Sequence, residues 1–167
     1  APEPASVTAG TRLSDGGWLA ELDAETGDIA ALVAPDARRI AGVDGCLIGY
    51  RHESYDAAEL QKHLDAYLQH RIEWAILDHD KPGLASAKTA RTARFAGRLL
   101  GTSDERTALA ELPDEARLLL GGPRRHALRL TALGPDRVEI ALVLHDKPAN
   151  RMPEAGFLLV KIGRAHV

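Results

Sequence analysis

Residues 18–33 read WLAELDAETGDIAALV, and this stretch decides the fold. From Trp18 to Leu22, apolar side chains recur at every second position, the pattern of a β-strand with one buried face. Turn-forming residues follow at 24–28, where Gly27 can adopt the positive φ that a tight turn requires. The same alternation returns over residues 29–33. The stretch therefore predicts an antiparallel β-hairpin.

Further strand patterns continue along the chain. The predicted strands are residues 46–52, 73–78, 107–112, 128–133, 138–144 and 157–160. Residues 134–136, Gly-Pro-Asp, form a turn between two of them, and residues 113–120 predict one or two helical turns. Residues 85–101 are compatible with either an arginine-bearing helix face or an irregular strand. Many short strands separated by turns predict a mainly β protein, an antiparallel β-sandwich that we expect to be incomplete.

One amphipathic helix is predicted within this β-rich pattern, after residue 54. Ser54 is the expected N-cap, and Asp56 favours the positive end of the helix dipole. Leu60, Leu64 and Tyr67 then recur at helical spacing. We expect this stripe to pack on the sheet.

Composition narrows the classes of function. The net charge of −3 argues against a nucleic-acid-binding surface, and no apolar run reaches membrane-spanning length. Cys46 is the only cysteine, so an internal disulfide is excluded, and it gives no indication of the compartment. We expect residues 1–10 to form a linker and residues 11–160 to form the sandwich. Residues 161–167 are interpreted as a sequencing artefact, because 162–167 resemble a translated adapter.

A polar, proline-bearing loop follows the predicted strand 138–144. Residues 146–156 read DKPANRMPEAG, and residues 78–84 echo them as DHDKPGL. Asn150, Arg151 and Glu154 carry the donors and acceptors that bind sugar hydroxyls, so they are the candidate substrate-binding residues. The alternative, which the residues favour, is an internal Arg151–Glu154 pair that braces the loop.

Other polar groups form no complete catalytic or metal site in the sequence. Glu59, His63 and His70 lie near one face of the predicted helix, but a solvated polar face explains them better than metal ligation. Residues 78–80, Asp-His-Asp, favour a turn over a general base. We therefore predict no catalytic residue and no metal ligand in this chain. A small enzyme using Asp78, His79 and His145 is kept as a third hypothesis.

Three motifs carry a family resemblance. They are RHESYD at 51–56, WAILD at 74–78 with KPGL at 81–84, and KPANRMPEA at 147–155. Together with the opening hairpin, they resemble the C-terminal β-domain of an uncharacterised α-mannosidase-like family related to glycoside hydrolase family 38, domain of unknown function 5054. The resemblance covers residues 11–160. The chain departs from the family at His79-Asp80 and at Gly156-Phe157.

The resemblance implies a fold and a partner. The fold is the large β-sandwich of such glycoside hydrolases, and the partner is a catalytic α/β barrel of the same parent chain. Zinc and the catalytic carboxylates are implied for that barrel, so no cofactor is expected here and no catalytic residue is carried over. We expect a non-catalytic sandwich that packs on the barrel and lines its sugar cleft with the 146–156 loop. The alternative is an autonomous carbohydrate-binding or protein-interaction module, which would expose a sugar-stacking aromatic. Neither nucleic acid nor a membrane is an expected partner.

Overall fold

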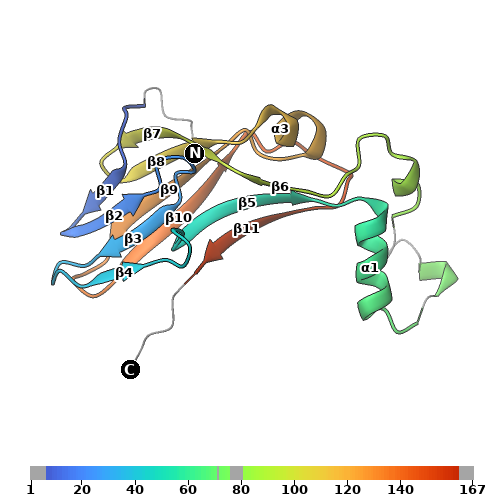
Figure 1. Cartoon of the computed structure of the whole chain (residues 1–167), viewed down its shortest axis with the longest axis horizontal. Helices are drawn as coiled ribbons and strands as arrows, with labels where there is room; N and C mark the ends of the chain where they lie inside the picture. The colour runs from blue at the N-terminus through green and yellow to red at the C-terminus, as the bar shows by residue number, and fades with distance from the viewer. Residues whose placement is uncertain (1–6, 71, 76–80, 162–167) are drawn as a thin grey trace.

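The computed structural model describes residues 7–70, 72–75 and 81–161, and it is a mainly β protein of two antiparallel sheets (Figure 1). The seven-stranded sheet contains β1 (Arg12–Asp15), β2 (Trp18–Leu22), β3 (Ile29–Val33), β4 (Arg39–Ala41), β5 (Ile48–Ser54), β6 (Ala93–Ala96) and β11 (Glu154–Val160). The four-stranded sheet contains β7 (Arg98–Asp104), β8 (Thr107–Glu111), β9 (Arg125–Ala132) and β10 (Val138–His145). The predicted antiparallel sandwich is confirmed.

The opening hairpin forms as predicted, with β2 paired to β3. Its turn is held by Asp23, whose carboxylate accepts hydrogen bonds from the backbone N–H groups of Glu25 and Thr26 and from the Thr26 hydroxyl. These hydrogen bonds lower the pKa of Asp23 below its ordinary value. Gly27 has a φ of 75°, as the turn requires.

The main core lies between the two sheets. The strand order is β1-β2-β3-β5-β11 in one sheet and β10-β9-β8-β7 in the other. Both β10 and β11 are therefore edge strands. The buried residues of the larger core cluster are Leu13, Trp18, Ala20, Leu22, Ile29, Leu32, Ala34, Leu47, Ala108, Leu128 and Leu130. On β2 the buried residues Trp18, Ala20 and Leu22 alternate with less buried ones, which explains why the period-two pattern was readable in the sequence.

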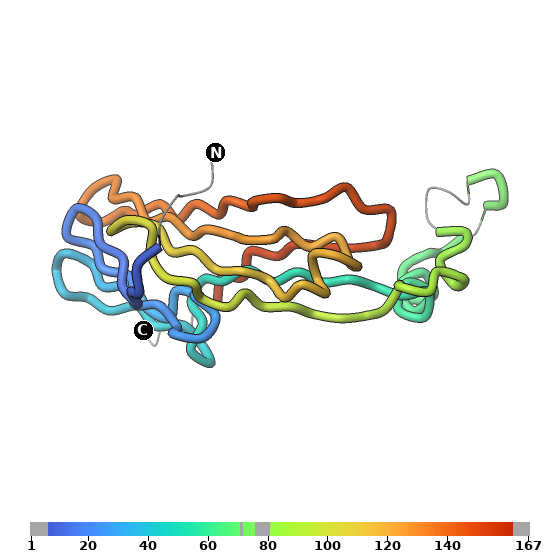
Figure 2. Tube along the Cα trace, turned by 90° about the horizontal axis from the view of Figure 1, so that it is seen from above, coloured from blue at the N-terminus to red at the C-terminus, as the bar shows by residue number. Residues whose placement is uncertain are grey.

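The helix α1 (Ala57–Tyr67) exists, but two expectations about it were wrong. Asp56 is the N-cap, because its carboxylate accepts a hydrogen bond from the backbone N–H of Glu59 at 2.9 Å. Ser54 instead ends β5, and its hydroxyl donates to the Arg91 carbonyl. The expected stripe does not pack on the sheet: within α1 only Leu64 is buried. In Figure 2, α1 lies beyond the end of the two layers.

The segment between α1 and β6 is built from short 3₁₀ turns, η1 (Glu73–Ala75) and η2 (Leu84–Ser86). The predicted buried strand at 73–78 is therefore wrong where the structure describes it, since Glu73–Ala75 is a helical turn with Trp74 exposed. Within residues 85–101, the first part belongs to η2 and a connecting loop, and the arginine-bearing part forms strand rather than helix, as β6 and the start of β7. The predicted short helix forms as α3 (Asp114–Leu120) and ends at Gly121, whose φ is 74°.

Candidate functional site

The predicted binding loop joins β10 to β11, and Glu154 at its end points into the protein. Its carboxylate forms an ion pair with Lys147, and Asn150 Nδ2 donates to it at 3.5 Å. His52 Nε2 lies 3.6 Å from the same carboxylate. The loop is therefore braced internally, as the alternative expected, but the predicted Arg151–Glu154 pair is wrong because Lys147 takes the place of Arg151.

Asn150 is also committed to the loop. Its side-chain oxygen accepts a hydrogen bond from the backbone N–H of Met152 at 3.2 Å. Gly121, at the end of α3, packs so closely against Asn150 that a Cβ there would lie 2.4 Å from Nδ2. Of the three predicted site residues, Asn150 and Glu154 thus hold the loop against α3 and β5, and only Arg151 remains exposed.

Arg151 lines an open groove that also contains the echo of its own loop. The groove has a volume of about 380 Å³ and is lined by Lys81, Pro82, Gly83, Leu84, Ala87, Arg151 and Met152. The two similar motifs of the sequence therefore meet in space. Leu84 is buried at the groove, while Lys81 and Arg151 are exposed and cationic. Such a lining can bind a ligand that combines an apolar face with hydroxyl or anionic groups.

Two exposed aromatic side chains lie in the same projecting segment. Trp74 of η1 is 85% exposed, and Tyr67 at the end of α1 is 77% exposed. Two further hollows border α1, one lined by residues 81–85 with Ala57, Leu60 and Gln61, the other by Tyr55, Glu59, Leu60, His63 and Pro153. Sequence reasoning assigned Trp74 to the core, because an apolar run of that length resembles a short strand. Its exposure makes this end of the molecule the candidate interaction site.

Two of the residues considered as metal ligands on α1, Glu59 and His63, contact neighbouring side chains of the same helix. Glu59 forms an ion pair with Lys62 at 2.9 Å, and the ring of His63 lies 4.9 Å from that of Tyr67. Over residues 7–70, 72–75 and 81–161, no group of three or more His, Cys, Asp or Glu side chains could hold a metal ion. Asp78 and His79 lie outside the described residues. His145 ends β10 and is buried.

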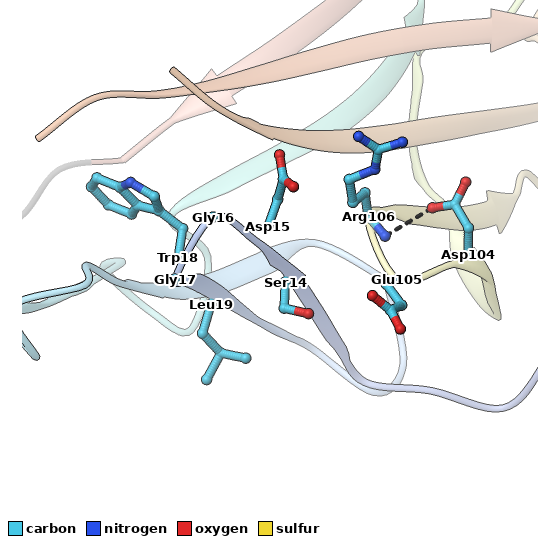
Figure 3. A pocket seen from close by; sticks show the side chains of 9 residues that line it. All are labelled: Ser14, Asp15, Gly16, Gly17, Trp18, Leu19, Asp104, Glu105 and Arg106. Atoms are coloured by element: carbon cyan, nitrogen blue, oxygen red, sulfur yellow. Dashed lines mark hydrogen bonds between the residues drawn. The ribbon is translucent and has the colours of Figure 1, made fainter. Parts of the chain in front are cut away.

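A further hollow lies at the opposite end, between the β1–β2 and β7–β8 turns (Figure 3). Its volume is about 690 Å³, but several of its side chains hold the scaffold. Asp15 accepts a hydrogen bond from the backbone N–H of Ala132 at 2.8 Å, and Trp18 Nε1 donates to the Gly134 carbonyl at 2.9 Å. Asp104 accepts from the backbone N–H of Arg106. We therefore assign this hollow to turn structure rather than to a site.

A buried polar cluster lies between the sheets and was missed from the sequence. Tyr50 and His52 of β5 are fully buried, as is His126 of β9, whose ring lies 5.1 Å from that of Tyr50. His52 Nε2 donates to the Leu120 carbonyl at 3.0 Å. Burial lowers the pKa of His126 to about 4, and burial together with the nearby Glu154 raises the pKa of Tyr50 to about 12. Tyr50 and His126 are therefore neutral at pH 7 and serve the core.

In the described part of the chain, no helix has the length and apolar character needed to cross a bilayer. Neither the curated proteins nor the solved structures give a match to this chain. A family model, Domain of unknown function (DUF5054), matches residues 4–141. This match covers most of the chain, and the protein therefore belongs to the DUF5054 family.

Proposed function

We propose that this chain is the non-catalytic β-sandwich portion of a glycoside-hydrolase-like, α-mannosidase-like protein. Its projecting end, defined as α1, η1, η2 and the loop 146–153, would pack on a catalytic barrel and contribute Arg151 to the sugar cleft. The zinc and the catalytic carboxylates would belong to the barrel. The upstream reading frame of the same gene provides a direct test: a barrel with Asp/His metal motifs supports the proposal, and an unrelated frame overturns it.

The observation that carries the proposal is the character of the projecting end. It combines the exposed apolar side chains Tyr67, Ile72 and Trp74 with the Arg151 groove. Apolar side chains gathered on one exposed segment favour contact with another protein surface. Membership of the DUF5054 family, together with the motifs at 74–84 and 147–155, supports the choice of a hydrolase-like parent.

Arg151→Ala is expected to weaken substrate binding in the parent protein without unfolding it. Arg151 is exposed, and its removal deletes a guanidinium that can donate hydrogen bonds to sugar oxygens. A charge-assisted hydrogen bond contributes about 1.5–3 kcal/mol, so KM for an aryl α-mannoside should rise about tenfold or more.

The matched control for this variant is Arg12→Ala, which removes an exposed arginine of β1, away from the groove. Both variants should keep the unfolding midpoint of the parent protein. If KM and kcat are unchanged by Arg151→Ala while the protein stays folded, Arg151 has no role in the cleft.

An autonomous carbohydrate-binding module is the second candidate, and the exposure of Trp74 favours it. A free indole face can stack on a sugar ring, while the second tryptophan, Trp18, is buried in the core. We expect oligosaccharide binding to quench Trp74 fluorescence and leave Trp18 emission unchanged. Trp74→Ala should lower the affinity at least tenfold, about 1.4 kcal/mol.

Titration calorimetry of the isolated chain with mannose, glucose and galactose oligosaccharides gives the affinity independently. Leu118→Ala is the control, since Leu118 is also an exposed apolar side chain but lies on α3, outside the projecting end. Absence of binding to any oligosaccharide, or binding that Trp74→Ala leaves intact, contradicts this candidate.

A further inference from the structure

The edge strand β11 is open on one side and apolar on both faces. It pairs with β5 along its whole length without a register shift, and among the described residues no strand other than β5 pairs with it. Leu158 and Val160 are 44% and 57% exposed, and Phe157 on the other face is also exposed. By contrast β1, at the other end of this sheet, is only four residues long and carries Arg12 and Asp15.

The exposed face of β11 continues the interior of the sandwich. Leu158 lies opposite the buried Tyr50, and Gly156 lies opposite the buried His52, so Leu158 and Val160 point to the core side of the sheet. Leu144 of β10, the edge strand of the other sheet, is also exposed, although its partner His126 is buried. The apolar interior is therefore uncovered along this side. Natural edge strands are usually protected by charges, prolines or bulges, and residues 155–160 contain none of these.

The backbone of β11 fixes which residues can pair outward. The Lys161 N–H donates to the Leu47 carbonyl, and the Pro153 carbonyl accepts from the Tyr55 N–H, so odd-numbered residues direct their backbone groups toward β5. Because these directions alternate along an antiparallel strand, Gly156, Leu158 and Val160 direct theirs away from the sheet.

We propose that β11 is a dimerisation edge, on which β11 of a second copy of this chain adds antiparallel to form one continuous sheet. A two-fold axis at Leu158 places Leu158 opposite Leu158 of the second copy, and Gly156 opposite Val160 of the second copy. All the outward-directed groups then meet in hydrogen-bonded pairs, each exchanging two bonds. A two-fold contact of this kind is self-complementary and closed, so it predicts a dimer and nothing larger.

Side-chain character supports the same register. On the core side Leu158 meets Leu158 of the second copy, and on the other face Phe157 meets Leu159 of the second copy. Every cross-strand pair between residues 156 and 160 is therefore apolar. This inference goes beyond the proposed function, because it uses the open side of the sandwich and not the projecting end.

Light scattering coupled to size-exclusion chromatography, at several concentrations of the chain, tests this. We expect twice the 18.0 kDa chain mass, and the monomer mass for Leu158→Lys, which places a charge at the two-fold axis. Leu158→Pro should also give the monomer, since it removes an outward N–H while sparing the bonds to β5. Leu133→Lys, at another exposed leucine in the β9–β10 turn, should leave the mass unchanged.

Circular dichroism must show that each variant is folded. If Leu158→Pro does not fold, Leu158→Lys still tests the proposal, because it keeps the backbone N–H of residue 158. A wild-type chain that is monomeric at all concentrations overturns the proposal and assigns the edge to another strand or protein. So does a dimer that persists in Leu158→Lys, or an open series of larger oligomers. These outcomes leave the Arg151 and upstream-gene tests untouched, so the two proposals fail separately.

Discussion

Replacing Arg51 with methionine is expected to lower the free energy of unfolding by about 3–5 kcal/mol, the range for removing one partner of a buried ion pair. Arg51 on β5 donates two hydrogen bonds to Asp28, at 3.0 and 2.6 Å. The two side chains are only 16% and 3% exposed. Without the guanidinium, the Asp28 carboxylate stays buried with its charge uncompensated.

Close packing around this pair keeps the Asp28 carboxylate buried. A Cβ at Gly49 would lie 2.3 Å from Asp28 Oδ1, so the strand fits closely around the carboxylate. Cys46 is also buried near this pair; desolvation, followed by the charge of Asp28, raises the pKa of its thiol. The carboxylate therefore cannot turn to solvent without moving β5.

Urea unfolding measures the effect, and the chain offers a matched control. Arg39 pairs with Glu21 at 2.6 Å, but the two side chains are 53% and 34% exposed. Arg39→Met should therefore cost at most about 1 kcal/mol. The double variant Arg51→Met with Asp28→Leu should recover most of the lost stability, because no buried charge remains. An Arg51→Met loss as small as that of Arg39→Met would show that the pair is solvated.

Local chemistry explains what the sequence could predict. The 18–33 hairpin was readable because Asp23, Thr26 and Gly27 build the turn among themselves, and the flanking alternation is a direct consequence of one buried face. The α3 boundary was readable for the same reason, since Gly121 ends the helix in the left-handed conformation.

Contacts between distant segments explain what the sequence could not predict. Trp74 lies in an apolar run that matches a buried strand, yet it forms part of the 3₁₀ turn η1 and is exposed. The partner of Glu154 was misassigned for a related reason. Arg151 is closer in sequence, but the fold of the loop brings Lys147 to the carboxylate and leaves Arg151 at the groove.

Part of the candidate site could be predicted from the sequence. The similarity of the 78–84 and 146–156 motifs was a real signal, because residues from both line one groove. The Asp28–Arg51 pair gave no such signal, since the two residues become neighbours only through the pairing of β3 with β5. No sequence pattern indicated that His126 is buried, because its burial depends on Tyr50, far away in the chain.

The burial of His126 leads to the second large effect, a loss of stability in mild acid. In the folded protein its pKa is lowered to about 4, from an ordinary value of 6.5 that the unfolded chain should retain. Between pH 6.5 and 4 the unfolded state therefore binds a proton that the folded state does not. The contribution of His126 to the free energy of unfolding is fully present above pH 6.5. It decreases by about 3 kcal/mol in total as the pH falls to 4.

Unfolding free energies measured by urea titration from pH 7.5 to 4 should show this fall, and His126→Phe should remove most of it. Phenylalanine keeps an aromatic ring against Tyr50 but cannot be protonated. His63→Phe, on the exposed face of α1, should leave the pH dependence as it is. Asp23 and Asp56 do not contribute to this difference. Their pKa values are lowered in the folded protein, so the stability that they provide is lost only at pH values below this window. An equal fall in His126→Phe and wild type would assign the acid sensitivity to another group and contradict the burial of a neutral His126.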